Sequence, residues 1–318
     1  MSLNHHVERI EILSTNLLDS QRGRVAHFRD LSNILSTPIG WHYVLDLSWA
    51  AEELSPVTVG SRFVDAGAGW GLVQWWLCQQ GADVFSVDRV SRRSKVGIKW
   101  RGRFPVKGLR GGKDLIRPDY PIVEAPERPE PIRVRDFMPP KNPKNWPGYP
   151  QKLVNTRSKM RYHPKAPGTV YIYNNDLGEM DEIRDGTIDG VVSISSLEHN
   201  HPDELGTVVD ELMRVLKPGG VIVATLGSAR DEDWFHEPSK GWCYTEQTLR
   251  KAFDIPASAP TNYDRYDELM AGLKNSKELR EGLADFYYKS GNNGMPWGKW
   301  DPQYPTVGVV KVKRRKWL

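Results

Sequence analysis

The sequence predicts an α/β protein built on a doubly wound, mostly parallel sheet. Two observations indicate this fold. Strand-like and helix-like segments alternate over residues 61–90 and again over 169–227, and such alternation requires right-handed crossovers with helices on both faces of the sheet. The 318 residues, 39% of them apolar, are also sufficient to fill a sizeable core.

The elements follow from apolar periodicity and turn residues. Three helices are expected before the first strand, at about 6–18, 24–35 and 41–54. The remaining elements are a strand at 62–66, a helix at 71–80, strands at 82–88, 169–174 and 189–195, a helix at 204–216, and strands at 221–227 and 306–315. No convincing strand lies between Phe253 and Asn262. The basic end of the last strand is interpreted as a charged sheet edge that opposes aggregation.

Residues 91–168 differ in composition from the rest of the chain. Over 91–170 there are 20 Lys and Arg against 6 Asp and Glu, whereas the rest of the chain carries 24 against 34. The same stretch holds 13 of the 23 prolines. It is interpreted either as a solvated, partly disordered insertion or as a cap that meets an anion. Interleaved aromatic residues favour a cap: Trp100, Phe104, Tyr120, Phe137, Trp146, Tyr149 and Tyr162.

These features predict a domain organisation. An N-terminal helical unit at 1–60 is expected to cover the carboxyl ends of the strands, and an α/β domain at 61–318 is interrupted by the basic insertion and by a second insertion at 256–304. Within the second insertion, Trp297 and Trp300 are expected to cover the core. The sequence makes no prediction of oligomeric state.

A cytoplasmic location is expected. The N-terminus lacks the apolar segment of a secretory signal, and no run of about 18 apolar residues occurs. Two cysteines, Cys78 and Cys243, are too few for a disulfide framework and are expected to be reduced.

The turn after the first strand indicates a ligand site. Gly67, Gly69 and Gly71 allow a sharp turn and a close approach by a ligand, and Asp88 ends the next strand, where its carboxylate can accept hydrogen bonds from ribose hydroxyls. The ligand is therefore expected to contain a nucleoside. A tight turn without a ligand is the alternative. Because Leu72 and Val73 stand where a dinucleotide site has its third glycine, NAD is disfavoured.

Several motifs in order resemble those of the class I S-adenosylmethionine-dependent methyltransferases, particularly the type 11 group typified by enzymes of ubiquinone and menaquinone biosynthesis. The segments that carry the resemblance are VDAGAGWG, SVD, NDL at 175–177, DGVVSISSLEH and RVLKPGGVIVAT, which together cover about 61–96 and 169–227. The resemblance implies a Rossmann-like methyltransferase sheet of seven strands ending in an antiparallel hairpin.

The resemblance also implies S-adenosyl-L-methionine as cofactor and a set of residues that bind it. Gly67, Ala68, Gly69 and Gly71 would form the turn against the methionine part, and Asp65 would anchor that turn. Asp88 would hold the ribose, Asp176 the adenine amino group, and Leu177 the ring. Ser195 would offer its carbonyl to the methionine ammonium, a place that Ser193 or Ser196 could also take.

Candidates for a general base lie past the fourth and fifth strands. His199 is the first candidate, His236 the second, and Glu198 the third, because each stands at the ligand end of the sheet. A bracing role for the Glu198–His199 pair is the alternative. His201 precedes Pro202 and is interpreted as a helix-start residue. No carboxylate cluster suggests a metal.

The basic insertion favours an anionic substrate. O-methylation of a phosphorylated or nucleotide-linked sugar, an acidic glycan or a natural-product intermediate is the leading hypothesis. Methylation of RNA or DNA is the alternative, with the insertion as a clamp. However, SLEH stands where amino-methylating nucleic-acid enzymes carry NPPY or DPPY. A cofactor-binding scaffold without catalysis is the third hypothesis.

Overall fold

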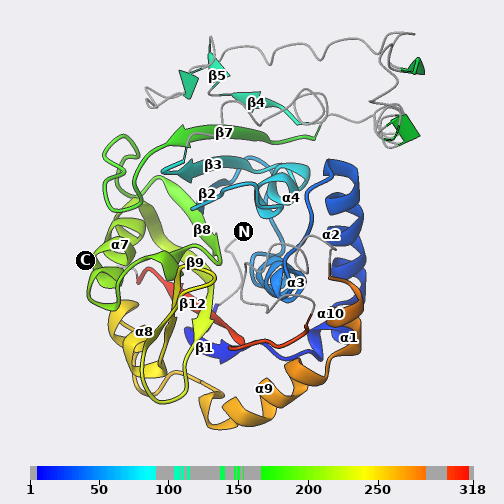
Figure 1. Cartoon of the computed structure of the whole chain (residues 1–318). Coiled ribbons are helices and arrows are strands. Elements are labelled where there is room, and N and C mark those ends of the chain that lie inside the picture. The colour runs from blue at the N-terminus through cyan, green and yellow to red at the C-terminus, as the bar shows by residue number, and fades with distance from the viewer. Residues whose placement is uncertain are drawn as a thin grey trace.

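The computed structural model of the chain (Figure 1) describes residues 6–90, 104–107, 109–110, 113–114, 137–139, 147, 149–150, 153, 166–283 and 299–314. Most of the predicted basic insertion lies outside these residues, as does Trp297. The predictions about that insertion therefore stay predictions.

A central sheet with parallel inner strands organises the molecule. Along the sheet the inner order is β7-β3-β2-β8-β9, with every neighbouring pair parallel. Strand order reverses between β2 and β8, which confirms the predicted doubly wound fold. The bounds are β2 Arg62–Ala66, β3 Asp83–Asp88, β7 Thr169–Asn174, β8 Ile188–Ile194 and β9 Leu216–Ser228.

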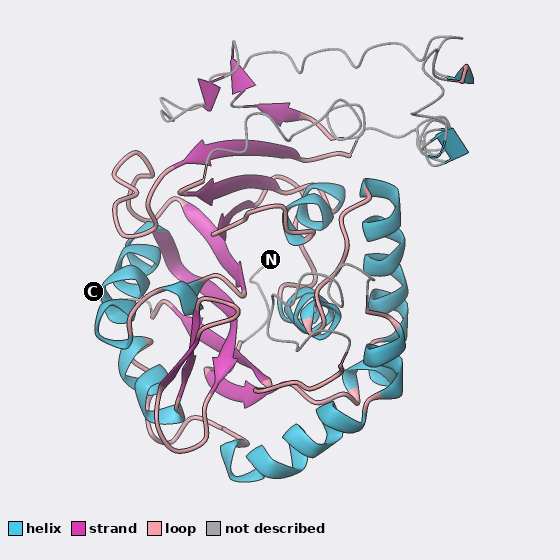
Figure 2. Ribbon diagram, in the orientation of Figure 1, coloured by secondary structure: helices cyan, strands magenta, loops and turns pink. Residues whose placement is uncertain are grey.

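Helices cover both faces of the sheet (Figures 1 and 2). One hydrophobic cluster joins the N-terminal helices and α4 to one face, and a second cluster joins α7 and α8 to the other. The helices of the first face are α1 Leu17–Ser20, α2 Arg22–Leu35, α3 Tyr43–Glu53 and α4 Val73–Gln79. Those of the second face are α7 Pro202–Val215 and α8 Glu246–Ala252.

The prediction of a first helix at about 6–18 is wrong. Arg9–Ile12 forms strand β1, which pairs antiparallel with β12, and only the short helix α1 follows it. The reason is the alternation in RIEI: Ile10 and Ile12 are buried, whereas Arg9 and Glu11 lie partly in solvent. Such a period of two belongs to a strand with one buried face.

The last strand, β12 (Thr306–Val312), lies inside the sheet. It pairs antiparallel with β9 on one side and with β1 on the other. The N-terminal strand therefore occupies the position beyond β12, and Thr261 forms only an isolated bridge to Ile10. The predicted edge role is wrong as well, because Lys311 is 3% exposed and bonds to Glu8 and the Asp254 carbonyl.

Smaller elements complete the described part of the chain. A hairpin of β10 (Trp234–His236) and β11 (Gly241–Tyr244) extends the sheet beside the end of β9. The others are β4 Val106–Lys107, β5 Leu109–Arg110, β6 Lys113–Asp114, the 3-10 helices η3 Leu197–His199 and η4 Tyr263–Arg265, and the helices α9 Tyr266–Asn275 and α10 Lys277–Glu281.

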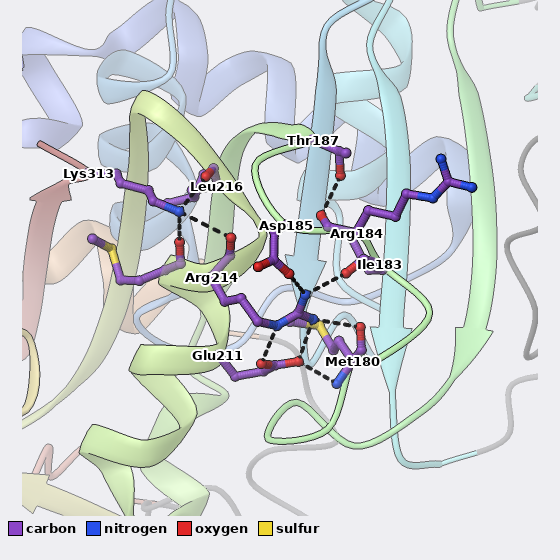
Figure 3. A network of polar contacts seen from close by, with 10 residues as sticks. Met180, Ile183, Arg184, Asp185, Thr187, Glu211, Arg214, Leu216 and Lys313 are labelled. Atoms are coloured by element: carbon purple, nitrogen blue, oxygen red, sulfur yellow. Dashed lines mark hydrogen bonds and ion pairs between the residues drawn. The ribbon is translucent and has the colours of Figure 1, made fainter. Parts of the chain in front are cut away.

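A polar network at the end of α7 holds the loop between β7 and β8 (Figure 3). Arg214 donates to the carbonyls of Met180 and Ile183 at 2.9 Å each and pairs with Glu211 and Asp185. Its hydrogen bonds to Glu211 are the main cause that raises the pKa of Arg214. This loop begins at the predicted adenine-binding segment, so the network bears on the geometry of the site.

Candidate active site

The glycine turn after β2 has the backbone geometry that the sequence predicted. Gly67 has a φ of +71° and Gly69 a φ of +44°, and both lie in the left-handed region that favours glycine. A Cβ on Gly67 would lie 1.5 Å from Ser196 Oγ. Ser196 thus occupies the place of a side chain at position 67, so only glycine fits there.

Asp88 ties the glycine turn to the end of β3. One carboxylate oxygen accepts a hydrogen bond from the Gly69 N–H at 2.7 Å, and the other accepts from the Val90 N–H at 2.7 Å. The side chain is half-buried, so its carboxylate also borders solvent. This places an anionic acceptor beside the turn, where a nucleoside ligand would present its ribose.

Gln74 is a functional residue that sequence reasoning missed. It is 1% exposed, and its side-chain amide donates to the Gly71 carbonyl at 3.0 Å and accepts from the Ser86 hydroxyl at 2.6 Å. Gln74 therefore links the glycine turn to β3 through these two hydrogen bonds. The available signal was a single amide among the apolar residues of VQWWLC.

A cavity of about 200 Å³ opens at the glycine turn. The predicted cofactor residues that line it are Asp65, Gly67, Ala68, Gly69, Gly71 and Ser195. The remaining lining residues were not predicted: Thr37, Pro38, Ile39, Tyr43, Leu47, Trp70, Leu72, Val73 and Ile194. Tyr43 and Leu47 come from α3, so the cavity lies between that helix and the ends of the strands.

Asp88, Asp176 and Leu177 do not line this cavity. Asp176 accepts a hydrogen bond from the Gly178 N–H at 2.9 Å and pairs with Arg89 at 3.2 Å, while 44% of its side chain is exposed. Leu177 packs against the core of the second face. Both stand at the end of β7, beside the end of β3 that carries Asp88.

Ser195 stands at the end of β8 with an unusual backbone. Its φ of +47° is uncommon for a residue with a side chain, and its N–H donates to the Thr225 carbonyl at 3.0 Å. The neighbouring serines have other contacts. Ser193 is buried and donates to the Ala66 carbonyl at 3.0 Å, and Ser196 lies against Gly67.

The three predicted base candidates lie outside the lining of the cavity. His199 is exposed on η3, and its Nδ1 donates to the Lys240 carbonyl at 2.8 Å. Glu198 is 5% exposed, and burial raises its pKa against the opposing effects of His42 and His199. His236 is also buried, and burial lowers its pKa.

Other predicted positions can now be placed. His201 caps α7 by accepting from the Asp203 N–H at 3.3 Å, which confirms its role at the helix start. Cys78 and Cys243 are free and buried. Trp300 packs against the first-face core.

The described part of the chain shows neither a metal-binding cluster nor a membrane-spanning helix. Among the described residues, no group of three or more His, Cys, Asp or Glu side chains could hold a metal ion. In the same part of the chain, no helix has the length and apolar character needed to cross a membrane.

Comparison with known proteins adds a family match. Residues 151–224, less than a quarter of the chain, match the family model described as a methyltransferase domain. No curated protein sequence matches the chain.

Solved methyltransferase structures resemble the chain at low similarity. The 1,6-didemethyltoxoflavin-N1-methyltransferase of Burkholderia thailandensis is 14% identical with a TM-score of 0.41, over 93% of this chain and 88% of that one. The geranyl diphosphate C-methyltransferase of Streptomyces coelicolor is 13% identical with a TM-score of 0.41, over 98% and 92%. Phosphoethanolamine N-methyltransferase 2 of Haemonchus contortus is 12% identical with a TM-score of 0.44, over 94% and 60%. The substrates of these proteins are not assigned to this chain.

The family match, the order of motifs, and the glycine turn joined to Asp88 define the class of protein. Together they indicate an S-adenosylmethionine-dependent methyltransferase, with S-adenosyl-L-methionine as the cofactor. The described residues fit that cofactor, because a cavity opens at the glycine turn and the Asp88 carboxylate stands beside Gly69.

Proposed function

We propose that this enzyme methylates a hydroxyl of a small anionic substrate, such as a phosphorylated or nucleotide-linked sugar, an acidic glycan or a natural-product intermediate. The observation that carries the proposal is the charge division of the sequence, with 20 Lys and Arg against 6 Asp and Glu over 91–170. That segment joins β3 to β7, whose carboxyl ends border the glycine turn, so a basic surface there would attract an anion.

The cofactor-binding roles are part of the proposal. Gly67, Ala68 and Gly69 would line the methionine part, with Asp65 anchoring the turn and Ser195 offering its carbonyl to the ammonium. For the rest of the cofactor, Asp88 would accept from the ribose hydroxyls, and Asp176 and Leu177 would contact the adenine. Bound there, the cofactor supplies an activated methyl group on sulfur. The chain's task is then to align the acceptor oxygen with the S–CH₃ bond and to remove its proton.

A small substrate is favoured over nucleic acid by the placement of α3. Tyr43 and Leu47 close the described cavity from the side of the N-terminal helices. Methylation of RNA or DNA remains the second candidate, because the interleaved aromatic and basic residues of the insertion also suit a single strand.

The expected reaction can be tested by transfer of a labelled methyl group from S-adenosylmethionine into an extract of the source cells, separated into RNA, DNA, glycan and small molecules. We expect label in a small anionic or glycan pool. Binding of that product to an anion-exchange resin should weaken after phosphatase treatment if the anion is a phosphate. Label that nuclease releases from RNA or DNA would contradict the proposal, and absence of label from every pool would favour the scaffold hypothesis.

The prediction that His199 is the base has its own test. It requires that His199→Ala retain cofactor affinity and lose about 10²-fold or more of the transfer rate, the usual range for a general base. Undiminished transfer at saturating cofactor would remove His199 as the base. His236→Ala and Glu198→Gln test the other two candidates in the same assay.

A further inference from the structure

The N-terminal end of α3 holds a buried imidazole–carboxylate pair. His42 Nδ1 lies 2.6 Å from Asp46 Oδ2, and both side chains are buried, that of Asp46 completely. Their spacing of four residues puts them on one face of the helix. The residues that follow each of them, Tyr43 and Leu47, line the cofactor cavity. The pair therefore lies directly behind the wall of the site.

Ser195 connects this pair to the cavity. Its hydroxyl donates to Asp46 Oδ2 at 3.3 Å, and Ser195 itself lines the cavity at the end of β8. The residue keeps a φ of +47°, a conformation that a residue with a side chain rarely adopts without a compensating role. A hydrogen-bonded chain thus runs from the cavity wall through Ser195 to Asp46 and His42.

The hydrogen bonding of this cluster is incomplete. In the described part of the chain, Asp46 Oδ1 is buried without a hydrogen-bond partner. A buried carboxylate oxygen without a donor is costly, and such groups call for a functional explanation. Asp46 therefore has one oxygen, Oδ1, without a donor, while its other oxygen, Oδ2, faces both Ser195 and His42.

We propose that Ser195 and Asp46 form the proton path of methyl transfer, with His42 as the residue that positions Asp46. This inference rests on the proposed O-methylation, and it puts Asp46 in place of His199 as the residue that gains the proton. As the acceptor oxygen bonds to the methyl carbon, the S–CH₃ bond breaks and its electron pair stays on sulfur. The hydroxyl proton passes to Ser195 Oγ, while the Ser195 proton passes to the Asp46 carboxylate. One proton is thus removed from the substrate and one is gained by Asp46.

The test compares Asp46→Asn, Ser195→Ala and the double variant with the wild type. The readouts are cofactor affinity by calorimetry with S-adenosylmethionine, and the rate of labelled methyl transfer into the small-molecule fraction at saturating cofactor. We expect unchanged affinity and a transfer rate reduced by about 10²-fold or more in Asp46→Asn, as for loss of a general base. Because both residues serve one path, the double variant should lose no more than Asp46→Asn alone.

Ser48→Ala is the matched control on the same helix. Ser48 is as buried as Asp46, and its hydroxyl has no hydrogen-bond partner among the described residues. Because Ser48 takes no part in the hydrogen-bonded chain from Ser195, the Ser48→Ala variant should transfer methyl groups at the wild-type rate. Thermal unfolding of every variant separates loss of the path from loss of the fold. If Asp46→Asn does not fold, Ser195→Ala decides, because it removes only the hydroxyl.

Four outcomes would overturn the proton path. Undiminished transfer in either single variant would exclude that residue's role. Losses that simply add in the double variant, or a loss of cofactor affinity equal to the loss of rate, would indicate structural effects only. Absence of transfer by the wild type into any fraction would instead refute the proposed function, and the path would fall with it.

Discussion

Gly67→Ala is expected to abolish cofactor binding and to destabilise the fold. The added Cβ would lie 1.5 Å from Ser196 Oγ and 2.5 Å from Ser196 Cβ, so β8 and the glycine turn would have to separate. The φ of +71° adds strain of about 1–3 kcal/mol for a residue with a side chain. Calorimetry with S-adenosylmethionine and thermal unfolding measure the two effects.

Two further variants separate the causes. In Gly67→Ala with Ser196→Gly the overlap is removed, so part of the stability should return while the backbone strain persists. Gly23→Ala is the control, since a Cβ at this position on α2 meets nothing within 4 Å and alanine is the better helix former. Wild-type cofactor affinity in Gly67→Ala would show that the turn is not the binding site.

Asp88→Ala is expected to weaken cofactor binding by about 10²-fold or more while the chain stays folded. Hydrogen bonds to a charged group contribute about 1.5–3 kcal/mol each, and two ribose hydroxyls would lose their acceptor. The Gly69 N–H would lose its partner as well. Calorimetric titration with S-adenosylmethionine measures the change.

The matched control for Asp88 stands at the opposite end of the same strand. Asp83 begins β3, away from the glycine turn, so Asp83→Ala should leave cofactor affinity unchanged. The intermediate variant Asp88→Asn keeps one acceptor oxygen without the charge and should bind more weakly than wild type but better than Asp88→Ala. Equal affinities of Asp88→Ala and wild type would contradict the ribose assignment.

The inner sheet was predictable because its signals are local. Strands such as Asp83–Asp88 are short apolar runs bounded by turn residues, and their order along the chain leaves few topologies. The first strand was missed because RIEI is short and lies beside Leu13 and Leu18, which extend an apparent helical period. Its partner β12 is about 300 residues away, and no local pattern reports such a pairing.

The site residues also divide into those that a local sequence pattern predicts and those that only the fold brings together. Gly67, Gly69 and Asp88 were predicted because the strand, the glycine turn, the helix and the end of the next strand follow one another in a short stretch of sequence. A covering role of residues 1–60 was also predicted, but the individual residues Tyr43 and Leu47 were not, since they follow the periodicity of any helix packed on a core. Asp46 is an acid within a helix, and only the fold shows that it meets Ser195 across 149 positions.

We propose that the glycine turn, Asp88 and Ser195 form the cofactor site. The most direct measurement is a crystal structure of the chain grown with S-adenosylhomocysteine. We predict the ribose on Asp88, the methionine part against Gly67 and Ser195, and the adenine beside Leu177. Density for the nucleoside at any other place, with the glycine turn empty at saturating ligand, would contradict the account.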